Sequence, residues 1–267
     1  MSSIIKELAE NSIIDIPNYD DVHREVIMGS YSYGCNDTES DMDIYAFCIP
    51  PKEILYPHLS GHIFGFDEFS ENFSRGQYQK HHIEYNNKNY DITIYKITNY
   101  FKLCMNCNPN MIDSLFVPRR SVKFESDIGK LIYENRHIFL CKKAWHSFKG
   151  YAYAQMHKMK SQTRIGKRKE TIDKFGYDVK FAYHVVRLIN EVEQILIDEN
   201  IILDRDREIL KSIRRGEWSM KDIEDYFERK EVQLDSVYVN SELNNKPRYN
   251  EIKQLLLNCL EMRYGSI

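Results

Sequence analysis

Long apolar runs are missing from this 267-residue sequence, whose uninterrupted apolar segments extend over only a few residues. A membrane-spanning helix needs about 20 apolar residues, and a secretory signal needs an apolar core of about 7 to 15. The first residues, MSSIIKELAENS, contain neither. We therefore expect a soluble cytoplasmic protein with no membrane partner.

The six cysteines lack the spacing of a disulfide framework. Without a secretion signal, they are expected to be free thiols. Cys104 and Cys107 form a C-x-x-C pair, but no second pair lies near it in the sequence. Two buried thiols are therefore favoured over a zinc or redox site.

Linkers rich in Gly, Pro or Ser are also missing, as are repeats of solenoid length, which argues against freely moving domains and repeat architectures. What is present is 42% hydrophobic and 13% aromatic residues, enough for a sizeable core. Charge is divided unequally: residues 1–118 hold 8 Lys and Arg against 17 Asp and Glu, whereas residues 119–267 hold 29 against 23. An acidic half can hold divalent metals, and a basic half attracts phosphates.

Residue periodicity divides the chain at the same point, after Pro118. Residues 1–118 are predicted to be an α/β domain with a helix around Ile4, Ile5 and Leu8, a loop over 58–78, and strands over 22–28, 42–47, 81–85 and 90–95. Residues 119–267 are predicted to be a helical domain, with helices over 127–139, 141–160, 173–199, 204–215, 219–231 and 247–263. The predicted fold class is α+β. Turn chemistry at 86–89 predicts a hairpin, and Pro109 suits the first turn of a helix.

The most informative stretch is Gly29-Ser30, followed eleven residues after Ser30 by Asp41-Met42-Asp43-Ile44. Residues i and i+2 of a strand project to one face, so Asp41 and Asp43 would present two carboxylates together. Adjacent anions favour a bound cation, and Mg²⁺ takes one or two carboxylates together with substrate phosphates. Gly29 would let a triphosphate approach the backbone, and Ser30 can offer its N–H and hydroxyl. Taken alone, a D-x-D pair is more often a solvated strand edge.

The full pattern, an apolar strand, Gly29-Ser30 and paired acids between apolar residues, resembles the signature of DNA polymerase β-like nucleotidyltransferases. The resemblance implies a mixed sheet, two Mg²⁺ or Mn²⁺ ions, and an NTP as donor. It also implies a third carboxylate on a neighbouring strand. Asp91 is the best candidate, with Glu84 on the other arm of the hairpin as its competitor. Asp41, Asp43 and Asp91 would then be the metal ligands and the catalytic residues.

Further motifs are similar to those of a bacterial and phage branch that includes RNA-repair-associated, RNA-ligase-linked polymerase β-like proteins. They are Asn108-Pro109-Asn110, Phe148-Lys149-Gly150-Tyr151-Ala152 and residues 180–188, so the similarity extends over roughly residues 25–215. Lys180, His184 and Arg187 share one helical face and become candidate nucleotide ligands, although a solvated face is an equal alternative. The remaining candidate nucleotide-binding residues are Gly29, Ser30, Tyr33 and Lys149, and Lys149 could instead form an interdomain salt bridge.

The densest basic run covers residues 157–169, in which seven of thirteen residues are Lys, Arg or His. Such a run is usually a solvated loop, but beside a nucleotide site it can bind the phosphates of an RNA acceptor. The candidate acceptor contacts are Lys158, Lys160, Arg164, Lys167 and Arg168.

Together these features predict an enzyme that moves an NMP from an NTP, with ATP or CTP as first candidates, to a hydroxyl acceptor with release of pyrophosphate. The favoured acceptor is an RNA 3′ end, as in tRNA repair or end modification. The alternative is a protein, as in antitoxin-like AMPylation, or a small molecule. A non-catalytic nucleotide-binding module is disfavoured because the aspartates and Gly29-Ser30 are intact.

Overall fold

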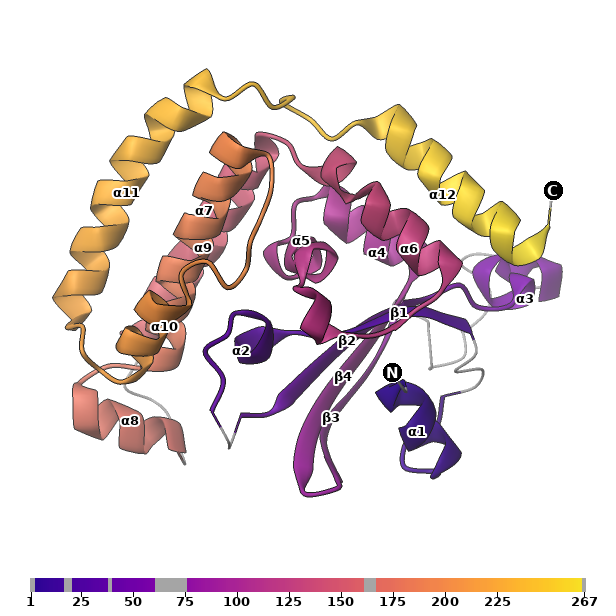
Figure 1. Cartoon of the computed structure of the whole chain (residues 1–267), viewed down its shortest axis with the longest axis horizontal. Helices are drawn as coiled ribbons and strands as arrows, with labels where there is room; N and C mark the ends of the chain where they lie inside the picture. Colours follow the sequence, from indigo (N-terminus) through magenta and orange to yellow (C-terminus); the bar gives the residue numbers. More distant parts are fainter. Residues whose placement is uncertain (1–2, 17–20, 38–39, 61–75, 161–166, 266–267) are drawn as a thin grey trace.

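A computed structural model describes residues 3–16, 21–37, 40–60, 76–160 and 167–265. In this part of the chain, one mixed sheet has the strand order β3-β4-β2-β1-β5 (Figure 1). Its strands are β1 (Val22–Ile27), β2 (Met42–Cys48), β3 (Gln77–Tyr85), β4 (Lys88–Lys96) and β5 (Val122–Glu125). β2 and β4 run parallel, and the other neighbouring strands are antiparallel. The predicted α+β class is confirmed.

Among the described residues, the four longest helices, with 16 to 21 residues each, all lie in the second half of the chain. In chain order, the helices are α1 (Ile4–Glu10), α2 (Gly29–Ser32), α3 (Lys52–Leu55), α4 (Ile97–Met105), α5 (Pro109–Phe116), α6 (Asp127–Glu134), α7 (Lys143–Met159), α8 (Lys167–Phe175), α9 (Val179–Asp198), α10 (Arg207–Arg214), α11 (Met220–Asn240) and α12 (Tyr249–Tyr264). The predicted helix over 173–199 is in fact two. Gly176 takes a left-handed φ of 81° after α8, and the Asp178 side chain caps α9 by accepting from the Lys180 N–H at 3.0 Å.

The local signals for the hairpin turn and for the start of α5 are confirmed. The β3–β4 hairpin turns at Asn86 and Asn87, which both have positive φ, as a two-residue turn between twisted strands requires. Pro109 opens α5, and the Asn108 side chain caps that helix. Much of the predicted 58–78 loop lies outside the described residues. All six cysteines are buried free thiols, with the sulfur atoms of Cys107 and Cys141 3.5 Å apart.

The two faces of the sheet pack against different cores. α1 covers one face, where fully buried Ile5 and Leu8 join Ile44 and Ile92. The other face lies against α2, α4, α5 and the helices beyond them (Figure 1), and Phe47 belongs to that larger core. Because side chains alternate along a strand, Asp43 shares its face with Phe47. The aspartates therefore lie on the side of the sheet that faces the helical half.

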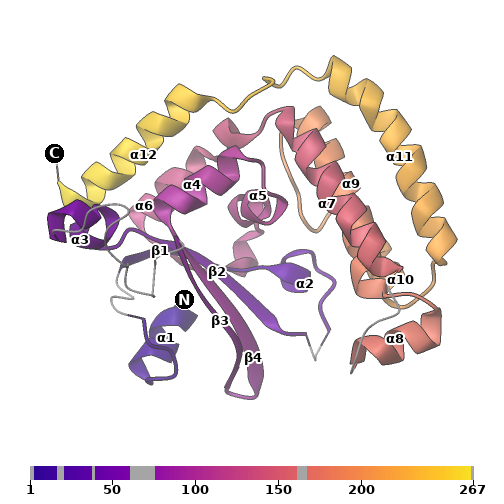
Figure 2. The same ribbon diagram turned by 180° about the vertical axis from the view of Figure 1, so that it is seen from behind.

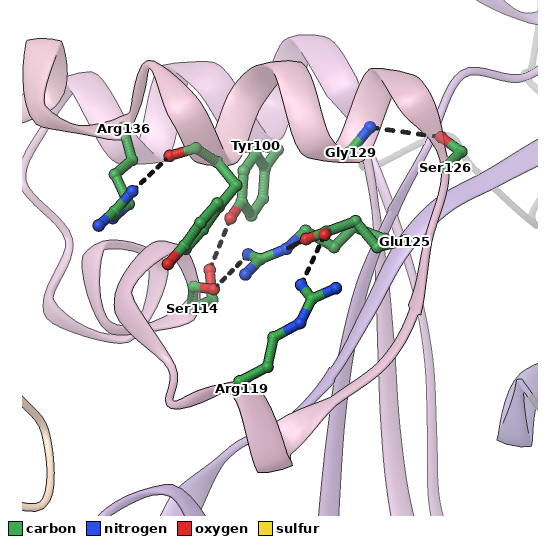
Figure 3. Close-up of polar contacts among 9 residues, drawn as sticks. Tyr100, Ser114, Arg119, Glu125, Ser126, Gly129 and Arg136 are labelled. Atoms are coloured by element: carbon green, nitrogen blue, oxygen red, sulfur yellow. Dashed lines mark hydrogen bonds and ion pairs between the residues drawn. The ribbon is translucent and has the colours of Figure 1, made fainter. Parts of the chain in front are cut away.

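The structure does not divide at Pro118. β5 lies beyond that point and pairs with β1 at the edge of the sheet. Figure 3 shows how this edge is held: Arg119 points at Glu125, and Ser126 caps α6 at Gly129. One hydrophobic core also contains residues from Val26 to Leu260. The predicted boundary thus falls inside a shared core.

The C-terminal helices wrap around the outside of the molecule. Figure 2 shows α11 beside α7 and α9, and α12 returning past α4 and α6 toward α3. At the end of α12, Arg263 pairs with Asp21 and the Tyr264 hydroxyl donates to the Pro50 carbonyl. These contacts tie the end of the chain to the sheet region. Within the described ranges, no helix combines the length and apolarity that a membrane span requires.

Candidate active site

Two of the three predicted aspartates, Asp43 and Asp91, lie on the neighbouring strands β2 and β4, and Asp41 lies just before β2. Asp43 and Asp91 are direct partners in the parallel β2–β4 pairing, and adjacent strands are about 4.8 Å apart. Asp41 directly precedes β2 and is exposed, whereas Asp43 is half-buried and Ile44 is fully buried. Strand parity therefore places Asp43 and Ile44 on opposite faces, as the sequence indicates.

Electrostatics show that these carboxylates influence one another. Burial raises the pKa of Asp43 above its ordinary value, and the negative charges of Asp91 and Asp41 raise that pKa further. The positive charge of Lys180, at the start of α9, acts in the opposite direction. Since a raised carboxyl pKa reflects an unfavourable anion, a bound cation would relieve the repulsion.

Gly29 packs directly against this cluster. Its φ is +63°, and a Cβ at this position would lie 2.1 Å from Asp43 Oδ2. The Met28 N–H also donates to the Asp43 carbonyl at 2.7 Å. Gly29 therefore leaves space for the Asp43 carboxylate, whereas the sequence suggested space for a triphosphate. Ser30 follows in α2 and is half-buried.

Within the residues that the structure describes, no three His, Cys, Asp or Glu side chains already converge closely enough to enclose a metal ion. The donor chemistry nevertheless suits one, because carboxylates on adjacent strands offer the hard oxygen ligands that Mg²⁺ takes. Asp43 and Asp91 are fixed by strand register. Asp41, exposed at the start of β2, is the ligand that would have to move inward.

A β-bulge beside Asp91 was not foreseen from the sequence. The pairing passes from Lys80↔Ile92 to Ile83↔Tyr90, so His81 and His82 together lie opposite Asp91. The His82 N–H donates to Asp91 Oδ1 at 2.8 Å, and His81 Nδ1 lies 3.5 Å from the same oxygen. The only sequence signal was a His-His pair at the start of a predicted strand.

Glu84, the competitor of Asp91, is exposed and lies opposite Asn89. This position is nearer the hairpin turn and outside the direct pairing with β2. The strand register therefore supports Asp91 as the third carboxylate.

Two predicted nucleotide ligands are instead parts of the interior. Arg187 is 4% exposed and pairs with Asp113 and with Glu191, the latter at 2.9 Å. Tyr33 is 2% exposed and donates its hydroxyl to Asp113 at 2.8 Å, and the Arg187 guanidinium lies 4.4 Å from its ring centre. The expectation that Arg187 and Tyr33 bind nucleotide is corrected: neither side chain reaches the surface.

This buried cluster joins α2, α5 and α9. One guanidinium faces two carboxylates, and burial raises the pKa of Glu191 well above its ordinary value. Burial also raises the pKa of Asp113, whereas the positive charge of Arg187 lowers the pKa of both carboxyl groups and so offsets part of the cost of burying them. The cluster thus connects the helix that carries Gly29 to the helix that carries Lys180.

The other helical candidates differ in position. Lys149 forms an ion pair with Glu231 at 2.8 Å and lies over the Trp145 ring. It therefore links α7 to α11. This salt bridge lies within the helical half, so the expected interdomain salt bridge is corrected to a contact between two helices of one predicted domain. Lys180 is exposed, and its charge acts on Asp43. His184 is half-buried, with its ring 4.1 Å from that of Tyr183.

The basic run is only partly described. Lys158 and Lys160 lie at the end of α7, where Lys160 pairs with Glu224 at 2.6 Å and Lys158 lies over the Phe181 ring. Arg164 and the side chains of Lys167 and Arg168 lie outside the described residues. Their predicted contact with an acceptor stays a prediction.

Comparison with known proteins identifies a family that matches most of the chain. The RNA repair pathway DNA polymerase beta family matches residues 19–261, a range that includes Gly29, the three aspartates and Lys180. No curated protein matches the chain at a significant level. The match covers the whole sheet and nearly all of the helical half, and on this evidence the chain belongs to the RNA repair pathway DNA polymerase beta family.

Proposed function

We propose that the protein is a metal-dependent nucleotidyltransferase that moves an NMP from an NTP to the 3′ end of an RNA, with release of pyrophosphate. Family membership indicates nucleotidyltransferase chemistry and a role in RNA repair. The observation that carries the proposal is the direct pairing of Asp43 with Asp91 on parallel strands, with Gly29 packed against the Asp43 carboxylate.

Asp41, Asp43 and Asp91 would hold two Mg²⁺ or Mn²⁺ ions. When bound, such ions lower the pKa of the acceptor hydroxyl and neutralise charge on the attacking and leaving oxygens. The chain's contribution is to orient the ligands. Because β-sheet register fixes Asp43 and Asp91, little reorganisation is needed when charge develops.

Lys180 is the predicted nucleotide ligand that the structure supports best. It is exposed at the start of α9, and its charge reaches Asp43. An ammonium group in this position can balance part of the negative charge of a triphosphate. The fold therefore suggests that the helical half supplies a cation to a site whose carboxylates belong to the sheet.

An RNA acceptor is supported by the family and by the excess of Lys and Arg after residue 118. Phosphate contacts by such residues produce affinity that falls as salt concentration rises. The alternative acceptors are a protein and a small molecule, and the following experiment distinguishes them from RNA.

The test uses purified full-length protein with Mg²⁺ or Mn²⁺, each α-labelled NTP in turn, and a tRNA pool. We expect label on RNA with the wild type and none with Asp43→Asn or Asp91→Asn. Glu84→Gln is the matched control on the same hairpin, and it should retain activity. Label on the protein alone, or on no RNA, would reject the RNA acceptor. Loss of activity in Glu84→Gln, with activity retained in Asp91→Asn, would reject our choice of third carboxylate.

A further inference from the structure

The bulge in β3 places two histidines opposite one aspartate. On either side of it, Lys80 and Ile83 lie on the face of the sheet that α1 covers. The Lys80 ammonium donates to the carbonyl of Ile13, just after α1, at 2.8 Å, and Ile83 is buried in the core under α1. In a regular strand, a single residue would lie opposite Asp91. The extra residue places both His81 and His82 there instead.

The backbone at this point is specialised. His82 has a φ of +56°, a conformation that costs free energy for a residue with a Cβ. Its N–H donates to Asp91 Oδ1 and so fixes the orientation of the carboxylate. Bulges are common next to active sites because they redirect a side chain, and the side chain that contacts Asp91 here is His81.

We propose that His81 is a nitrogen ligand of the metal ion held by Asp91, on the acceptor side of the site. The His81 imidazole is 53% exposed, and its Nδ1 lies 3.5 Å from Asp91 Oδ1, whose side chain is 28% exposed. Two ligand atoms bound to one cation at about 2.1 Å are roughly 3.0 to 3.5 Å apart. The pair is therefore spaced for a shared ion and is open to solvent.

A nitrogen ligand changes which cation the site prefers. Carboxylates suit Mg²⁺ and Mn²⁺, whereas imidazole suits transition metals and adds no negative charge to a site that already has three carboxylates. His81 should therefore increase the preference for Mn²⁺ over Mg²⁺. This inference rests on the proposed function, because it assumes that Asp43 and Asp91 hold a cation.

The test is pulsed electron paramagnetic resonance of full-length protein loaded with Mn²⁺ alone, without nucleotide. We expect coupling from a ¹⁴N nucleus in the wild type, replaced by the ¹⁵N pattern when histidine is ¹⁵N-labelled. The coupling should vanish in His81→Asn, and the affinity for Mn²⁺ should fall by about tenfold to a hundredfold, a loss typical of disrupted metal shells. His82→Asn is the matched control, since Asn tolerates positive φ and keeps the backbone N–H.

The results separate two failures. Bound Mn²⁺ without nitrogen coupling in the wild type, or coupling that persists in His81→Asn, would overturn the role of His81 and leave the carboxylate site intact. Mn²⁺ affinity unchanged by Asp43→Asn would reject the carboxylate site itself, and His81 with it. Circular dichroism of each variant shows whether the fold is retained.

Discussion

Gly29→Ala tests whether the close approach between Gly29 and Asp43 matters for catalysis. The new methyl group would lie 2.1 Å from Asp43 Oδ2, where ordinary contacts begin near 3.4 Å. The carboxylate must therefore retreat by more than about 1 Å, and a misplacement of that size can reduce a rate by about a hundredfold. The positive φ adds a conformational cost of roughly 1 to 2 kcal/mol.

Gly34→Ala provides a matched control for the backbone cost. Gly34 also has a positive φ, of +68°, but its added Cβ would lie no closer than 3.4 Å to the nearest atoms, on Arg207 and Asp204. Both variants should therefore lose similar stability, about 1 to 2 kcal/mol in urea unfolding. Only Gly29→Ala should slow nucleotide transfer, because only its new methyl group displaces the Asp43 carboxylate. The displacement itself should cost little stability, because the Asp43 side chain can rotate away.

The assay is single-turnover transfer of labelled NMP, together with urea unfolding, for wild type and both variants. We expect the Gly34→Ala rate to stay within about threefold of wild type and the Gly29→Ala rate to fall about a hundredfold. Equal rates for the two variants at equal stability would refute the assignment of Gly29 as the residue that makes room for Asp43.

Three further predictions concern charge. Arg187→Met leaves two buried carboxylates without a counter-charge, so the free energy of unfolding measured in urea should fall by about 3 to 5 kcal/mol. A decrease below about 1 kcal/mol would contradict the buried cluster. Lys180→Ala should raise KM for the NTP about tenfold, as loss of a charge-assisted contact implies. The control, Lys149→Met, should leave KM unchanged. Equal KM values for the two variants would argue against Lys180 as a phosphate ligand. Burial, reinforced by the charge of Arg263, lowers the pKa of His23 from 6.5 to about 4. As pH falls, His23 is therefore protonated in the unfolded chain before it is protonated in the folded protein. The free energy of unfolding should decrease between about pH 6.5 and 4, by at most about 3 kcal/mol. His23→Phe should flatten that loss in urea midpoints measured at pH 7, 5 and 4, and an unchanged pH profile would contradict the shift.

Much of the local structure followed from sequence alone. The Asn86-Asn87 turn, the start of α5 at Pro109 and the face of β2 that carries Asp43 depend on the conformational preferences of a few neighbouring residues. The helical stretches followed from apolar periodicity for the same reason. The break at Gly176 was missed, because a glycine in a helical pattern can be tolerated or can end the helix. Two helix ends also differ from the prediction, since α6 ends at Glu134 and α11 continues to Asn240.

Tertiary structure decided which of these elements meet. The pairing of Asp43 with Asp91 depends on strand order, and β5 joins the sheet from beyond Pro118, since strand partners are chosen by long-range packing and not by local periodicity. Arg187 shares a helix face with Lys180 in the sequence pattern, yet only packing against Asp113 and Glu191 determines that it is buried. The paired acids and Gly29 thus indicated the chemistry, because that information is local in the chain. The approach of Asp91, the histidines opposite it and Lys180 to Asp43 depended on how distant segments pack.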